Sequence, residues 1–286
     1  MKMRLYRLAA QLMIVLLGMA TLDVGRGTWH VARSLAQQPD IFQSEVPESS
    51  PGRLVSPRFE KLGIDEGLSQ SSILDMMQDR NGFMWFGTQD GLNRFDGYEV
   101  KIYENVPFDT TSILAGWSSS LAEDAEGRIW VGTWAGTPSI SVMDPVTETF
   151  TAYKFDPEDP FSMSPERPRR MIFDRQGALW IASGGGGVDR MLPGEPGVFE
   201  HFTHEPSDET SLSDGEARTV YEDSEGDIWI GTLNGLNRFV PPEAETPLDS
   251  TAAGRGSFVR YLYRAETEDE SQGDAILDIF ERQEEP

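Results

Sequence analysis

Residues 79–96 read DRNGFMWFGTQDGLNRFD, and this pattern returns three more times along the chain. The later copies begin at Asp124, Asp174 and Asp223 and read DAEGRIWVGTWAGTPSISVMD, DRQGALWIASGGGGVDRMLPG and DSEGDIWIGTLNGLNRFVP. Their tryptophans recur at intervals of roughly 45 to 50 residues. Because a constant period of this length is typical of repeat architectures, the repeat decides the fold.

Each copy contains four short runs rich in β-branched and aromatic residues, separated by Gly, Asp, Asn and Pro. Such runs are typical of strands joined by tight turns, and four strands per period predict one β-propeller blade. We therefore expect an all-β fold with four complete four-stranded antiparallel blades. Their expected bounds are about residues 71–104, 116–155, 168–204 and 216–264.

The recurring residues have structural roles in this fold. Asp at the first position of the pattern and Gly at the fourth suit a β-turn whose carboxylate accepts backbone N–H groups. The tryptophans are expected to fill the space between blades, with Gly87, Gly132 and Gly231 allowing close approach. The residues assigned to the structural repeat are Trp85, Trp130, Trp180, Trp229, Asp79, Asp124, Asp174, Asp223, Gly82, Gly127, Gly177 and Gly226.

The stretch SILDMMQDRNGFMWFGTQDGLNRFDG, residues 72–97, closely resembles the two-component regulator propeller repeat. The resemblance covers about Phe59 to Glu281. It implies the exported sensor region of a hybrid histidine kinase or a related signalling protein. The second and third copies depart from the pattern at residues 137–139 and 182–187, so their loops are not expected to follow the others.

Two partial repeats flank the complete ones. Phe59 to Leu62 is predicted to be a stray outer strand, and Ala275 to Glu281 restates the innermost strand of the first copy. Innermost and outermost strands are not neighbours in a blade, so we expect an open arc rather than a closed ring. The chain is interpreted as the N-terminal fragment of a longer protein. The resemblance implies a histidine kinase or related output domain in that parent.

The N-terminus has the layout of a secretory signal. Three basic residues precede an apolar run at 8–22, and small residues follow at 34–36. The run is shorter than the roughly 20 residues that a membrane span requires. Residues 1–36 are predicted to be a signal peptide or an uncleaved signal anchor, and residues 37–57 a flexible linker. We therefore expect the propeller in the periplasm or at the extracellular face of the membrane.

The composition limits the classes of partner that the protein is expected to bind. The formal net charge is −24, and an acidic surface repels phosphate backbones, so nucleic-acid binding is disfavoured. The same acidity keeps an exported β-protein soluble. The chain contains no cysteine and needs neither a disulfide nor a thiolate metal site, and no cofactor or metal is expected.

No catalytic set stands out in the sequence. His201 and His204 are separated by three positions in a predicted strand, which places them on opposite faces and argues against a histidine metal centre or a serine triad. The run Gly184 to Gly187 is not followed by Lys and Ser or Thr, so it predicts a turn rather than a phosphate-binding loop.

A ligand site is predicted where the inner strand of each blade begins. Alignment on the repeat Asp places Ser72, Trp117, Arg167 and Glu216 at one equivalent position, and these four residues differ in chemistry. Trp117 would stack on a sugar face, and Arg167 would engage a carboxylate. Trp134 occupies a neighbouring loop position. The predicted ligand residues are Trp117, Trp134, Arg167 and Glu216, although loop residues also vary where packing does not constrain them.

The leading functional hypothesis is therefore an exported sensor for an extracellular small molecule or oligosaccharide, such as a glycan fragment. An interaction scaffold is the alternative, and the sequence does not separate the two. A propeller lyase or hydrolase is less favoured, because such enzymes need a histidine or paired carboxylates near the axis. Membrane contact is expected only through the N-terminal signal or the parent, and a dimer of the parent is left open.

Overall fold

The computed structural model describes residues 60–134, 136–242, 256–262 and 275–282. The predicted signal segment and linker lie outside these residues. Within them the protein forms sixteen strands and one short 3-10 helix, Ile64–Glu66. No helix in the described ranges is long and apolar enough to cross a membrane.

The strands form four separate four-stranded antiparallel sheets, one for each repeat. The first sheet contains β1 (Ile73–Gln78), β2 (Met84–Thr88), β3 (Leu92–Phe95) and β4 (Val100–Tyr103). The second contains β5 (Trp117–Glu123), β6 (Ile129–Trp134), β7 (Pro138–Met143) and β8 (Phe150–Lys154). The third contains β9 (Pro168–Phe173), β10 (Leu179–Ser183), β11 (Gly187–Met191) and β12 (Phe199–Phe202). The fourth contains β13 (Ala217–Glu222), β14 (Ile228–Thr232), β15 (Gly235–Val240) and β16 (Ser257–Tyr261).

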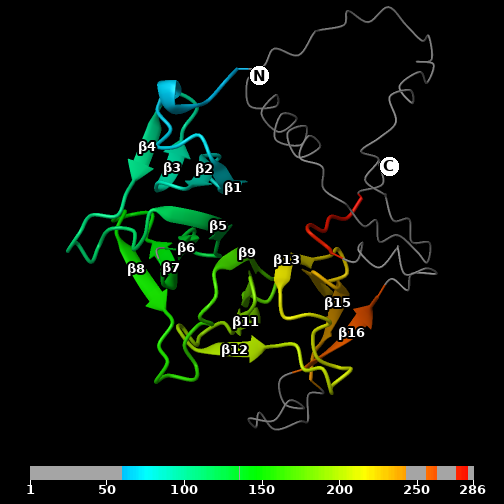
Figure 1. The fold of residues 1–286 in the computed structure, drawn as a ribbon. Helices are drawn as coiled ribbons and strands as arrows, with labels where there is room; N and C mark the ends of the chain where they lie inside the picture. Colours follow the sequence, from blue (N-terminus) through cyan, green and yellow to red (C-terminus); the bar gives the residue numbers. More distant parts are fainter. Residues whose placement is uncertain (1–59, 135, 243–255, 263–274, 283–286) are drawn as a thin grey trace, which may run out of the picture.

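The four sheets follow one another along an arc (Figure 1). The first strand of each sheet, β1, β5, β9 or β13, lies on the inner side of the arc, and the fourth strand lies on the outer side. In each sheet the strands are neighbours in chain order. This arrangement confirms the prediction of four complete propeller blades.

A carboxylate organises the first hairpin of every blade. The Oδ1 atom of Asp79 accepts the backbone N–H groups of Asn81 and Phe83, each at 2.9 Å. Gly82, the fourth residue of the turn, has φ +90°, which a side chain rarely adopts. The equivalent aspartates Asp124, Asp174 and Asp223 accept the same pair of backbone groups in their own turns.

The same aspartate also accepts a hydrogen bond from the tryptophan of its blade. The indole Nε1 of Trp85 donates to Oδ2 of Asp79 at 2.8 Å, and the other three blades repeat this contact at 2.7 to 2.8 Å. The indole rings are 1 to 6% exposed. Each Asp therefore joins the turn to the core of its blade. The repeated pairs are Asp79 with Trp85, Asp124 with Trp130, Asp174 with Trp180 and Asp223 with Trp229.

Hydrophobic clusters between the sheets hold neighbouring blades together. Trp85 stacks on Tyr103 within the first blade, and both belong to a cluster that includes Leu121 and Val131 of the second. Close backbone approach assists this packing. A Cβ on Gly87 would lie 2.6 Å from the carbonyl oxygen of Ser118 in the second blade, so the predicted need for glycine there is confirmed.

Arginine side chains cross two of the boundaries between blades. Arg80, in the first hairpin turn of its blade, donates through Nε to Oε1 of Glu123 and through an Nη to the backbone oxygen of Ala125, each at 2.7 Å. Arg175 donates through its Nη atoms to the backbone oxygens of Ser224 and Asp223 in the fourth blade, at 3.0 and 2.7 Å, and its Nε lies 3.9 Å from Oε1 of Glu222. We call Arg80 and Arg175 the inter-blade arginine clamps. The second blade has Ala125 at the equivalent position and therefore no clamp toward the third.

The two predicted stray strands are not strands in the structure. Residues 60–62 have no strand assignment, and Phe59 lies outside the described ranges. Residues 275–282 are also irregular, although Ile276 N–H donates to the Thr232 oxygen at 2.8 Å and Ile279 is 5% exposed. A strand needs a regular ladder of hydrogen bonds to a partner. Among the described residues, the backbone-to-backbone bond at Ile276 contacts the fourth blade but does not continue into a ladder.

Candidate functional site

The structure places the four equivalent residues where the alignment predicts them. Trp117 is the first residue of β5, and Ser72, Arg167 and Glu216 each stand immediately before the inner strand of their blade. All four are therefore at the same end of the inner strands. The side chains at this end belong to four different blades.

In every blade a β-bulge lies two residues after this equivalent position, within the inner strand. The pairing of β1 with β2 passes from Ile73 to Asp75 and omits Leu74, and the other three first hairpins omit one residue in the same way. A bulged residue leaves the ladder and its side chain is re-aimed. The omitted residues are Leu74, Ser119, Arg169 and Arg218.

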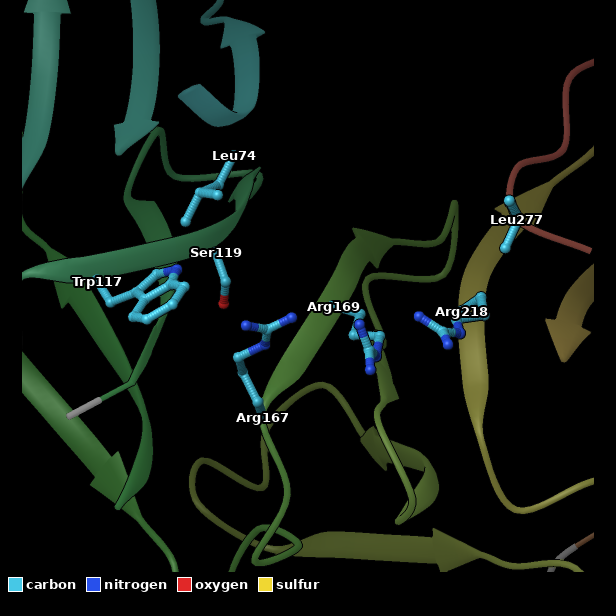
Figure 2. Close-up of a pocket in the computed structure, with 7 residues that line it drawn as sticks. All are labelled: Leu74, Trp117, Ser119, Arg167, Arg169, Arg218 and Leu277. Atoms are coloured by element: carbon cyan, nitrogen blue, oxygen red, sulfur yellow. The ribbon is translucent and has the colours of Figure 1, made fainter. Parts of the chain in front are cut away.

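These bulged residues line a cleft of about 230 Å³. Figure 2 shows their side chains converging from β1, β5, β9 and β13 on one space. Leu277 joins them from the partial fifth repeat, at the position equivalent to Leu74. The complete lining consists of Leu74, Trp117, Ser119, Arg167, Arg169, Arg218 and Leu277.

The cleft contains a cluster of three arginines. Arg169 and Arg218 both bind Oε1 of Glu216, at 2.8 and 2.9 Å. The guanidinium carbon of Arg167 lies 5.7 Å from the centre of the Trp117 ring, which is cation–π distance. We call Arg167, Arg169 and Arg218 the central arginine cluster.

The cluster is partly desolvated and carries more positive than negative charge. Burial lowers the pKa of Arg169, and the nearby charges of Arg218 and Arg167 lower it further, while Glu216 acts in the opposite direction. The cluster has three guanidinium groups, and two of them share one carboxylate. The arrangement favours a further negative charge near the cleft.

The positive charge of a fourth arginine close to the cluster is already balanced by a carboxylate. Arg170 lies 3.3 Å from the Asp75 carboxylate, which also accepts the backbone N–H of Leu121 at 2.8 Å. Burial raises the pKa of Asp75, and Arg170 counteracts this shift. This pair connects the first and third blades, and Arg170 therefore does not add free positive charge to the cluster.

The walls of the cleft also carry more hydrogen-bond donors than acceptors. In the described part of the protein, Trp117 Nε1, Arg169 Nε and Arg218 Nε are buried and have no hydrogen-bond partner. The Ser119 hydroxyl is bonded to backbone oxygens, including that of Pro168 at 2.7 Å. Excess donors around a cleft suit a ligand with acceptor oxygens.

The sequence prediction of the site identifies some of these residues and misses others. Trp117 and Arg167 line the cleft, and Glu216 binds two of its arginines. Trp134 is paired with Trp117 across β5 and β6 but does not line the cleft. The prediction missed Ser119, Arg169 and Arg218. Their spacing of two residues from the aligned positions was the available signal, because such residues share one face of a strand.

The two histidines in the described part of the chain, His201 and His204, lie on the outer part of the third blade. His201 in β12 contacts the buried Asp189 carboxylate through Nδ1 at 2.7 Å, and His204 Nδ1 is 2.6 Å from the Leu212 oxygen. Neither lines the central cleft. Across the described residues, no group of three or more His, Asp or Glu side chains is placed to hold a metal ion.

The glycine run of the third blade forms the turn that the sequence predicts. β10 ends at Ser183 and β11 begins at Gly187, with Gly185 at φ +102° between them. A Cβ on Gly187 would lie 2.1 Å from the Phe202 oxygen, so this position requires glycine. The glycine run therefore forms the tight turn between β10 and β11.

Comparison with known proteins identifies the repeat. Residues 67–90, 112–135 and 211–234 match the family described as two component regulator propeller. Over 48 residues the chain is 60% identical to histidine kinase P4 of Formosa agariphila, a match that spans 17% of this chain and 4% of the kinase.

Two solved structures give a broader comparison. The extracellular domain assigned to the hybrid two component system BT3049 of B. thetaiotaomicron is 24% identical, with a TM-score of 0.50 over 76% of this chain and 38% of that domain. The extracellular domain assigned to BT4673 of the same organism is 17% identical, with a TM-score of 0.48 over 71% and 30%. The chain thus spans less than half of the length of these relatives.

Each matched segment coincides with a defined part of a blade. The three segments contain β1 and β2, β5 and β6, and β13 and β14. They include the Asp turn, the tryptophan and the bulge that aims a side chain at the cleft. Three segments of the chain therefore match the two-component regulator propeller repeat, and each of them forms the first hairpin of a propeller blade.

Proposed function

We propose that the chain is the exported ligand-sensing propeller of a two-component-type signalling protein. In this proposal it recognises an extracellular ligand, such as a glycan fragment, and passes the signal to an output domain outside the chain. The repeat family supports this function, as does the 48-residue similarity to a protein named a histidine kinase. Export is supported by the description of the BT3049 domain as extracellular.

The bulge in each inner strand is the observation that carries the proposal. The four blades share one backbone plan, yet the bulged residue is leucine in one, serine in another and arginine in two. The Asp and Trp that stabilise each blade are the same in every copy, whereas the bulged residues differ. Different side chains gathered at one cleft are suited to recognising an asymmetric ligand.

The predicted ligand residues receive definite roles in this proposal. Trp117 offers an aromatic face to a sugar ring, and Arg167 beside it binds a polar substituent. Glu216 orients Arg169 and Arg218, which it contacts directly. Trp134 acts from the neighbouring strand by supporting Trp117.

Calorimetric titration of the purified chain with neutral, uronic-acid and sulfated oligosaccharides tests the proposal. We expect at least one of these classes to bind and Trp117→Ala to weaken that binding by about tenfold or more, because a stacked aromatic ring contributes about 1 kcal/mol or more beyond its burial. Tyr98→Ala is the matched control, since Tyr98 is an aromatic residue that is 93% exposed and does not line the cleft.

A folded Trp117→Ala variant that binds as tightly as the unmodified chain would place recognition elsewhere and favour the interaction-scaffold alternative. Absence of binding to every oligosaccharide class would contradict the glycan assignment. Circular dichroism and thermal unfolding of both variants separate a binding effect from loss of structure.

A further inference from the structure

The central arginine cluster stands in contrast to the rest of the chain. The protein has 48 acidic and 24 basic residues, yet three of the seven residues that line the cleft are arginines. They come from β13 and from the beginning of β9, and so from two separate blades. An acidic protein that gathers arginines at a single cleft concentrates positive potential there.

The geometry of Glu216 indicates what the arginines can bind. One carboxylate oxygen of Glu216 receives both Arg169 and Arg218, at 2.8 and 2.9 Å. The two guanidinium groups therefore converge on a single oxyanion position between adjacent blades. Glu216 is 30% exposed and is the acidic partner that both arginines share.

One acidic side chain does not balance the cluster. In the described part of the chain, no ion pair is made by Arg167, and its guanidinium lies against the Trp117 ring. Arg170 is paired with Asp75 and belongs to a separate contact. The cleft therefore combines unbalanced guanidinium charge, excess N–H donors and an aromatic ring.

We propose that the central cleft is specific for an acidic oligosaccharide, whose carboxylate or sulfate group is bound by the central arginine cluster. This inference rests on the proposed sensor function and specifies the ligand class. Arginine binds such oxyanions through paired N–H groups at fixed geometry, more strongly than it binds neutral hydroxyls. The ligand anion competes with Glu216 for Arg169 and Arg218, and the sugar ring beside it lies on Trp117.

The first experiment compares trigalacturonic acid with its fully methyl-esterified form, which has the same backbone without charge. Calorimetry with the purified chain should show binding of the acid that is at least about tenfold tighter than binding of the ester. Inorganic sulfate, compared with chloride at equal ionic strength, tests a tetrahedral oxyanion without a sugar. The sulfate should raise the thermal unfolding temperature of the unmodified chain more than that of the double variant Arg169→Gln and Arg218→Gln.

Two variants should change anion binding in opposite directions. Arg169→Gln with Arg218→Gln should weaken anion binding at least about tenfold, whereas Glu216→Gln should strengthen it, because the competing carboxylate is removed. A purely structural role for Glu216 predicts no gain in affinity. Arg175→Gln is the charge-matched control, since Arg175 lies beyond the opposite end of β9 and does not line the cleft.

The outcomes separate this inference from the proposed function. Equal binding of the acid and its ester, unchanged by loss of Arg169 and Arg218, would overturn the acidic ligand class while leaving a glycan sensor in place. Sulfate stabilisation that is equal in the unmodified chain and the double variant would show an adventitious ion only and would also overturn the inference. Tighter acid binding that depends on both arginines and increases with Glu216→Gln would establish it.

Discussion

At the scale of the residue, one aspartate per blade has two tasks. Asp79 holds the first hairpin turn through Oδ1 and the Trp85 indole through Oδ2. Asp79 is 7% exposed and Trp85 is 1% exposed, so their hydrogen bond is shielded from water. The role of Asp in the turn could be predicted from the sequence. Its contact with the tryptophan could not, because residues six apart meet only after the hairpin has formed.

Trp85→Phe separates the two contributions of this residue. Phenylalanine retains an aromatic ring in the core but cannot donate to Asp79, and we expect a loss of about 1.5 to 3 kcal/mol in the free energy of unfolding, as for hydrogen bonds to charged groups. Trp85→Ala should cost about 3 to 5 kcal/mol, because a cavity is added. Urea unfolding followed by circular dichroism measures both changes. A phenylalanine variant as stable as the unmodified chain would show that the indole hydrogen bond adds nothing.

At the scale of the element, neighbouring blades are joined in two different ways. The first and third blades contact their successors through the inter-blade arginine clamps. At the boundary between the second and third blades the Trp130 and Phe173 rings meet edge to face, with centroids 5.3 Å apart. Aromatic pairs also cross the other two boundaries, Tyr103 with Phe150 and Trp180 with Phe239. Aromatic packing is therefore common to all three boundaries, and the arginine clamps are added at two of them.

This difference predicts different responses to salt. Arg80→Ala should lower the free energy of unfolding by about 1 kcal/mol or less, and the effect should shrink in about 1 M NaCl, because exposed ion pairs are weak and screened. Phe173→Ala should cost about 2 to 3 kcal/mol at either salt concentration, since part of an aromatic contact is lost. Urea unfolding at low and high salt makes the comparison. Equal salt dependence in both variants would contradict the proposed division of contacts.

The strands and the site were not equally predictable at this scale. Four strands per repeat follow directly from alternating runs and turn residues, and the first blade, predicted at about residues 71–104, extends from Ile73 to Tyr103. The side chains of Arg169 and Arg218 point inward because of bulges. A bulge changes the direction of a side chain, but no particular residue type marks its position in the sequence. Trp134 was expected at the site because loops were aligned by sequence, but β6 is the second strand of its blade and lies farther from the cleft than β5.

At the scale of the whole molecule, each blade packs mainly against its neighbours in the arc. Repeat structures of this kind distribute stability over units and the interfaces between adjacent units. Residues 275–282 extend this series beside the fourth blade. Ile279 packs with Trp229 there, and Glu281 accepts the Ser224 hydroxyl at 2.6 Å.

Ile279→Asp should therefore have a local effect. A carboxylate placed among buried apolar side chains is unfavourable, and we expect faster amide hydrogen exchange in β13 to β16 with little change in β1 to β4. Phe280→Asp is the matched control, because Phe280 is 46% exposed. Hydrogen exchange followed by mass spectrometry resolves the blades. A uniform increase in exchange over all four sheets would contradict the view that each blade is stabilised mainly by its neighbours.

The bulges have a consequence for how such proteins diversify. Leu74, Ser119, Arg169 and Arg218 take no part in ladder pairing between the first two strands of their blades, so the requirements of the sheet restrict their identity less than those of their neighbours. Mutations at these four positions can accumulate while the Asp and Trp framework is preserved. A lineage of such propellers can therefore acquire new chemical preferences one substitution at a time, without passing through unfolded intermediates.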